Sequence, residues 1–123
     1  MDAPVELTVV ARRSSPLALT PARGAEDTLF AEQLGRELAA LEPRIEMRST
    51  EDGAGDAPTF MVTSRASKGT VRFVGVPRVN LFRALLDSIR RASTGEHGLP
   101  DGWAEQLDGL PRPVHIRVFA TPL

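Results

Sequence analysis

The sequence predicts one α/β domain built on a mixed sheet. The chain has 123 residues, which is long enough to bury a single core without disulfide or metal support. Its hydrophobic fraction of 41% and charged fraction of 25% lie near the averages of globular domains. Its apolar residues also switch between strand and helix periodicity along the chain. The expected order is strand, helix, three strands and helix, followed by a short helix and a final strand.

The first half of the chain predicts a strand, a loop, a helix and a second strand. Residues 5–11 alternate apolar and polar and end in an apolar run, as in a strand buried near its C-terminal end. Residues 12–24 contain two serines, two prolines and a glycine, which favour a loop. Residues 44–49 alternate strictly, as in a strand with one wet face. Residues 28–41 predict a helix that ends before Pro43, with an apolar side made of Leu29, Phe30, Leu34, Leu38 and Leu41.

The middle of the chain predicts a hairpin and a second long helix. Residues 59–63 and 70–76 are rich in β-branched and aromatic residues, and a short polar link joins them, so we expect antiparallel strands. Asn80 can cap a helix that ends near Thr94 and Gly95. The side of this helix that faces the core is expected to carry Leu81, Phe82, Leu85, Leu86 and Ile89.

The last part of the chain predicts a short helix and a strand. Residues 100–110 fit a helix, and we expect Trp103 to pack it onto the body. Residues 114–120 alternate as clearly as any strand in the chain. Such a strand leaves unpaired backbone groups unless it joins a sheet, its own or that of a neighbouring copy, and the second case would build a dimer. The residues expected to make this contact are Val114, Ile116, Val118 and Ala120.

Composition excludes several classes of function. The chain has no cysteine, so it cannot carry out thiol-disulfide exchange, cysteine catalysis or zinc-thiolate chemistry on its own. Fifteen basic residues balance sixteen acidic ones, which disfavours nucleic acid and anionic membranes as partners. Residues 1–6 lack the basic start and apolar middle of a secretory signal, so we expect a cytoplasmic location.

No residue pattern predicts a metal, a cofactor or a catalytic group. His97 and His115 stand alone in the sequence and lack the paired spacing of a zinc site. The acidic residues between 51 and 56 lack the full ligand pattern of a calcium loop. Arg90 and Arg91 end a helix, where cations interact favourably with the dipole. These residues are expected to have structural or solvent-facing roles.

The predicted element order resembles that of the thioredoxin fold. A more specific likeness is the Pro-Thr-Phe sequence at residues 58–60, because a proline stands at the head of the third strand in that fold. The resemblance implies a cis peptide bond between Ala57 and Pro58, which an X-Pro bond can adopt at a cost of about 0.5–1 kcal/mol. A trans proline at the first residue of a strand is the alternative, and sheet geometry permits it equally.

Two further segments narrow the resemblance. Residues 72–77 read Arg-Phe-Val-Gly-Val-Pro and are similar to a stretch in tandem thioredoxin-fold proteins. These proteins are the N-terminal region of the alkyl hydroperoxide reductase flavoprotein subunit and the glutaredoxin-like protein disulfide oxidoreductases. In the same families a linker helix and an opening strand lead into a second unit, and residues 99–110 and 114–122 resemble them. The resemblance therefore implies a degenerate thioredoxin-like domain at residues 1–98 and the start of a second unit at 99–123.

The resemblance also implies where a redox site would lie. The cysteine pair of an active unit would follow the first strand, and serine cannot replace it because exchange requires a mixed disulfide. The first unit of the flavoprotein subunit likewise lacks the pair. The degenerate loop of this chain consists of Arg12, Arg13, Ser14, Ser15 and Pro16.

Two functions are compatible with these features. The first is a redox-inactive domain, not an enzyme and without a cofactor, that acts as a protein-interaction, scaffolding or oligomerisation module. The alternative is the N-terminal, non-catalytic half of a thiol-disulfide or alkyl hydroperoxide reductase system whose Cys-x-x-Cys unit is missing from this chain.

Overall fold

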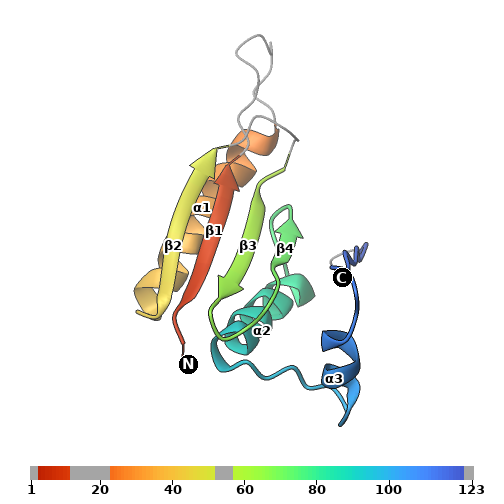
Figure 1. Cartoon of the computed structure of the whole chain (residues 1–123). Helices are drawn as coiled ribbons and strands as arrows, with labels where there is room; N and C mark the ends of the chain where they lie inside the picture. Colours follow the sequence, from red (N-terminus) through yellow and green to blue (C-terminus); the bar gives the residue numbers. More distant parts are fainter. Residues whose placement is uncertain (1–2, 12–22, 52–56, 121–123) are drawn as a thin grey trace.

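The computed structural model describes residues 3–11, 23–51 and 57–120 (Figure 1). These residues form a mixed α/β structure with a four-stranded sheet and three helices. The order through the second helix is the predicted β-α-β-β-β-α. The elements are β1 (Val5–Ala11), α1 (Arg23–Leu41), β2 (Ile45–Glu51), β3 (Thr59–Ser64), β4 (Val71–Val74), α2 (Asn80–Thr94) and α3 (Trp103–Asp108).

The sheet has the strand order β2-β1-β3-β4. Strands β1 and β2 run parallel, with Val5 opposite Ile45, and α1 supplies the crossover that a parallel pair needs. Strand β3 is antiparallel to β1, and β4 is antiparallel to β3, so the predicted hairpin is confirmed. Strands β2 and β4 are the two edges of the sheet.

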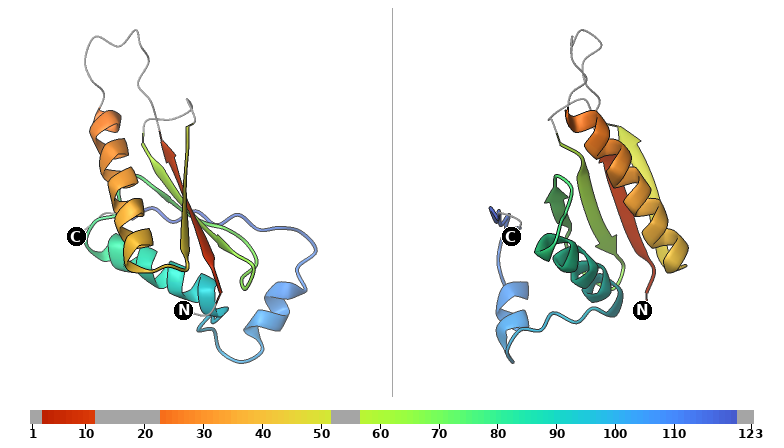
Figure 2. Two further views of the ribbon diagram at one scale, coloured as in Figure 1. Left: turned by 90° about the vertical axis from the view of Figure 1, so that its left-hand side faces the viewer. Right: turned by 180° about the vertical axis from the view of Figure 1, so that it is seen from behind.

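Helices α1 and α2 lie on the same face of the sheet (Figure 2). Every second residue of β1 from Val5 to Ala11 is buried beneath them, while Glu6, Thr8 and Val10 on the opposite face are only half buried. This alternation is the pattern of a strand with one covered face. The core lies between the sheet and the two helices, and its largest fully buried side chains are Phe60, Leu7, Leu85, Val5, Val9, Val62 and Pro58.

Helix α1 packs on the sheet through small side chains. Its buried residues include Ala31, Gly35 and Leu38, which recur at helical spacing. A Cβ atom at Gly35 would lie 3.0 Å from Cε of Met47 and 3.1 Å from Cγ2 of Val9. The close approach of helix and sheet therefore depends on this glycine.

The predicted inner face of α1 was partly wrong. Leu34 and Leu38 contact the core, but Leu29, Phe30 and Leu41 are exposed. The helix begins at Arg23, five residues earlier than predicted. The small residues Ala31 and Gly35 are buried on the face toward the sheet beside Leu38, so Leu29, Phe30 and Leu41 fall on the outer surface.

Helix α2 ends as predicted and begins with a different cap. Gly95 adopts a left-handed conformation with φ of 76°, and its N–H donates to the Arg91 carbonyl over 2.8 Å. The N-cap position is Val79, whose side chain offers no hydrogen bond, and Asn80 is the first helical residue. The predicted capping role of Asn80 is therefore wrong. Helix α2 packs on the sheet through Leu85, Ile89, Ala92 and Ser93, whereas Leu86 is exposed.

A buried serine ties the start of the chain to the end of α2. The Ser93 hydroxyl donates to the Ala3 carbonyl over 2.7 Å and accepts from the Ala3 N–H over 3.1 Å. Ser93 is 1% exposed. The segment that leads into β1 is thus fixed to α2 by paired polar groups inside the protein.

Candidate interaction surface

The predicted cis bond is absent. No peptide bond among the described residues is cis, so the Ala57–Pro58 bond is trans and the cis prediction is wrong. Pro58 is fully buried directly before β3, and its carbonyl accepts a hydrogen bond from the Gly75 N–H over 2.7 Å. A trans proline is compatible with this place because a residue at the start of a strand need not donate to the ladder. The degenerate loop predicted at residues 12–16 lies outside the described residues.

The additional C-terminal strand is also absent. Residues 113–120 have no regular secondary structure and are exposed throughout. Among the described contacts, none of them hydrogen bonds to the sheet of the same chain. A strand requires a neighbouring backbone as well as an alternating pattern. Pro111 and Pro113 precede the segment, and two prolines favour an extended, stiff connection over a tight return to the sheet.

Apolar side chains of this segment face solvent. Val118 is 83% exposed and Phe119 is 93% exposed, and Val114, Ile116 and Ala120 are exposed as well. Large exposed apolar patches in soluble proteins mark interaction sites more often than chance would give. We name residues 114–120 the C-terminal segment.

Helix α3 adds to the exposed apolar surface. It buries no residue, and Trp103 is 56% exposed, so the prediction that Trp103 packs the helix onto the body is wrong. Leu107 and Leu110 are exposed too. An ion pair between α3 and the loop that joins β3 to β4 connects Nζ of Lys68 to Asp108 over 3.9 Å, and exposed pairs of this kind stabilise little.

The β4 edge of the sheet is open and apolar. Strand β2 carries Glu46 and Arg48 at the other edge, and charged residues discourage strand pairing. Strand β4 presents Val74, which is 77% exposed. The C-terminal segment runs on the β4 side of the molecule in both the front and the rear view (Figures 1 and 2). An open edge and a strand-like segment without a partner thus lie on the same side of one chain.

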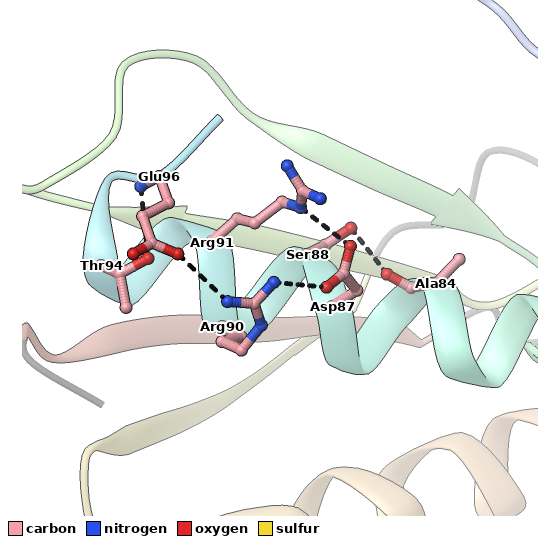
Figure 3. Close-up of polar contacts among 7 residues, drawn as sticks. All are labelled: Ala84, Asp87, Ser88, Arg90, Arg91, Thr94 and Glu96. Carbon is pink, nitrogen blue, oxygen red and sulfur yellow. Dashed lines mark hydrogen bonds and ion pairs between the residues drawn. The ribbon is translucent and has the colours of Figure 1, made fainter. Parts of the chain in front are cut away.

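A charged cluster fixes the end of α2 (Figure 3). Asp87 accepts hydrogen bonds from Nε of Arg91 over 2.8 Å and from Nη2 of Arg90 over 3.0 Å. Nη1 of Arg90 also donates to Glu96 over 3.2 Å. The hydrogen bonds from Arg91 and then Arg90 lower the pKa of Asp87, and the bond to Asp87 raises the pKa of Arg90. Both arginines are paired, which supports their predicted structural role.

Within the described parts of the chain, the other titratable residues do not assemble into a site. Nδ1 of His97 accepts the N–H of Leu99 over 3.0 Å, which is a local contact within the turn. No group of three or more potential metal ligands occurs within residues 3–11, 23–51 and 57–120. In the same residues, no helix is long and apolar enough to cross a bilayer.

Comparisons with known proteins give no family assignment. No family model matches the chain, and no curated protein is similar to it at a significant level. The chain's own surface therefore has to indicate its function.

Proposed function

We propose that the chain is a redox-inactive domain of thioredoxin-like fold that works by contact with protein, as a docking, scaffolding or oligomerisation module. The observation that carries the proposal is the exposed C-terminal segment, whose apolar side chains and backbone have no partner among the described contacts. As part of the same proposal, the partner is protein and not nucleic acid or membrane, and the compartment is the cytoplasm. The balanced charge supports the choice of a protein partner.

The arrangement of elements supports the thioredoxin-like part of the proposal. A parallel β1-α1-β2 unit is joined through β3 to an antiparallel β4, and α2 follows. A parallel β-α-β unit followed by a β-hairpin and a helix is the arrangement that the resemblance to thioredoxin-fold proteins implies. The trans bond before Pro58 departs from it. Because α3 buries none of its residues, the division into a domain at 1–98 and an appended region at 99–123 is part of the proposal too.

The absence of cysteine supports the redox-inactive part. Thiol-disulfide exchange proceeds through a thiolate and a mixed disulfide, and this chain has no sulfhydryl group to form either. Under this proposal, a domain of thioredoxin-like fold without cysteine acts by binding another protein.

The same segment favours the second candidate function. In the N-terminal, non-catalytic half of a reductase system, residues 114–120 would be the opening strand of the next unit. An exposed alternating stretch that follows a linker helix fits that position. Under this alternative the segment pairs within a following unit, so this chain alone would not associate with itself through it.

Sedimentation separates the two functions. The contact proposal predicts that the intact chain associates as its concentration rises, while a version ending at Leu110 stays monomeric and unfolds at the temperature that the intact chain shows when it is dilute enough to be monomeric. The temperature should not change because residues 111–120 are exposed. Val118→Asp should weaken association by placing a charge on the apolar side of the segment, whereas His115→Asp on its polar side serves as the matched control. A folded monomer in every sample would remove the proposal and leave the alternative.

A further inference from the structure

We infer that the C-terminal segment of one copy pairs antiparallel with strand β4 of a second copy, and that the reciprocal exchange builds a two-fold dimer. The inference rests on the proposed function and names its partner. It follows from the backbone of β4, the pattern of the segment and the connection between them.

The outer edge of β4 has backbone groups directed away from the sheet. The Gly75 N–H donates to the Pro58 carbonyl, which fixes that pair as hydrogen bonded. Hydrogen-bonded pairs alternate along an antiparallel ladder, so the odd-numbered residues of β4 direct their N–H and C=O groups toward β3. Arg72 and Val74 direct theirs away from β3. These two residues offer two donors and two acceptors to an additional strand.

The other edge of the sheet is less suited to pairing with an additional strand. The outer strand there is β2, and three of its seven residues are charged, namely Glu46, Arg48 and Glu51. One of them, Arg48, is already paired with Glu6 on the neighbouring strand over 3.4 Å. Charged edge strands resist pairing. Strand β4 carries a single charge, at Arg72, so it is the edge that an apolar strand would join.

The two faces of the segment match the two faces of β4. Phe73 packs against the core on the helix-covered face, and Val71 lies on the same face because strand side chains alternate. The apolar residues of the segment should lie beside them. Antiparallel registers that meet this condition differ in where they place Arg117, and like charges directly opposite each other are unfavourable. The register that keeps Arg117 away from Arg72 and sets no proline opposite β4 pairs Val71 with Ala120, Arg72 with Phe119, Phe73 with Val118, and Val74 with Arg117.

The connection to the segment favours a second copy over the same chain. Pro111 and Pro113 fix φ and lack N–H groups, so residues 110–113 behave as a semi-rigid spacer. In the single chain the segment runs on the β4 side without forming a strand (Figure 1). A connection that holds a strand away from its own sheet promotes exchange of that strand between copies. Each dimer would then contain two such pairings.

Disulfide trapping tests the pairing directly, since the chain has no cysteine of its own. We would mix the single variants Val74→Cys and Arg117→Cys and oxidise them. Both positions are exposed, so neither change should prevent folding, and circular dichroism checks this. The expected result is a disulfide-linked dimer in the mixture and little in either variant alone. A bond in the mixture can only join two chains.

A register control and three further outcomes complete the test. His115→Cys mixed with Val74→Cys should cross-link about tenfold less, because diagonal neighbours lie roughly 7–8 Å apart, beyond the usual span of a disulfide of about 4.4–6.8 Å. If the unmodified chain associates but Val74→Cys and Arg117→Cys do not cross-link, this pairing is wrong and the proposed function stands. If the chain sediments as a monomer, both fail. A chain that carries both Val74→Cys and Arg117→Cys would, if it cross-links as a monomer, show that the segment pairs with its own β4 edge, and this would overturn the exchange.

Discussion

Gly35 lets α1 approach the sheet. It lies in the middle of the helix, where glycine costs about 1 kcal/mol relative to alanine, so its presence needs a structural reason. That reason is the space already occupied by Met47 and by the fully buried Val9. Glycine at this position lowers the helix propensity of α1 but allows the helix to pack closely on the sheet.

Gly35→Val should therefore destabilise the domain. The added side chain must displace Val9, whose branched side chain has little freedom, and overpacking of this kind costs about 1–3 kcal/mol. Ala40→Val adds the same branched side chain at an exposed position of the same helix and serves as the control. Chemical denaturation gives both free energies of unfolding. Equal losses in the two variants would show that Gly35 has no packing role.

Ser93 fixes the start of the chain from inside the protein. Ser93→Ala removes the donor to the Ala3 carbonyl and should lower the free energy of unfolding by about 1–2 kcal/mol, the cost of an unsatisfied buried group. Ser88→Ala is the matched control because the Ser88 hydroxyl donates to Ala84 at the exposed surface of the same helix. It should change stability by less than about 0.5 kcal/mol. The prediction fails if thermal or chemical unfolding shows similar effects for both.

At the scale of single residues, the sequence predicted alternation better than backbone isomers. Every buried position of β1 follows from its apolar pattern. The isomer at Pro58 does not, because cis and trans X-Pro bonds differ by only about 0.5–1 kcal/mol and surrounding contacts decide between them. Ser93 was missed because one serine on an apolar helix face has no sequence pattern that marks its partner.

At the scale of elements, the charged cluster on α2 gives a pH-dependent contribution. The bonds from Arg91 and Arg90 lower the pKa of Asp87 in the folded state. A carboxyl whose folded pKa is lowered stabilises the protein above its unfolded pKa, and this stabilisation is lost as the pH falls through the folded pKa. The i, i+3 and i, i+4 spacing of these residues is the sequence signal that could have predicted the cluster.

Asp87→Asn should accordingly lower stability at neutral pH and have a shrinking effect in acid. The difference from the natural chain should decline as the pH falls below about 4, the usual range for an aspartate. It should also decline with added salt, because the cluster is exposed. Asp101→Asn, at an exposed aspartate outside the cluster, controls for the change in net charge. A difference that stays constant from neutral pH to pH about 2 would contradict this assignment.

Hydrophobic periodicity was sufficient to predict some of the helices and strands and insufficient for others. The hairpin and the end of α2 followed from strand pattern, proline and glycine positions. The face of α1 did not, because a short distance between helix and sheet favours Ala31 and Gly35 there, while Leu29, Phe30 and Leu41 are exposed. Residues 114–120 have a strand pattern, but pairing depends on a neighbouring backbone that local sequence does not supply.

At the scale of the whole molecule, the surface divides into two parts. Residues 3–94 bury a core beneath α1 and α2, apart from the ranges that the structure does not describe. Residues 99–120 bury almost nothing and expose a tryptophan, leucines and branched residues. The first part explains stability, and the second is the basis of the proposed contact. The proposed function therefore depends on what the C-terminal segment contacts.

Amide hydrogen exchange at several protein concentrations shows directly whether the C-terminal segment pairs with a second copy. If the segment pairs with β4 of a second copy in the proposed register, the amides of Arg117 and Phe119 become protected as concentration rises, together with those of Arg72 and Val74, while β1 stays protected throughout. Rapid exchange of the Arg117 and Phe119 amides at every concentration would contradict the pairing of the C-terminal segment with β4 of a second copy.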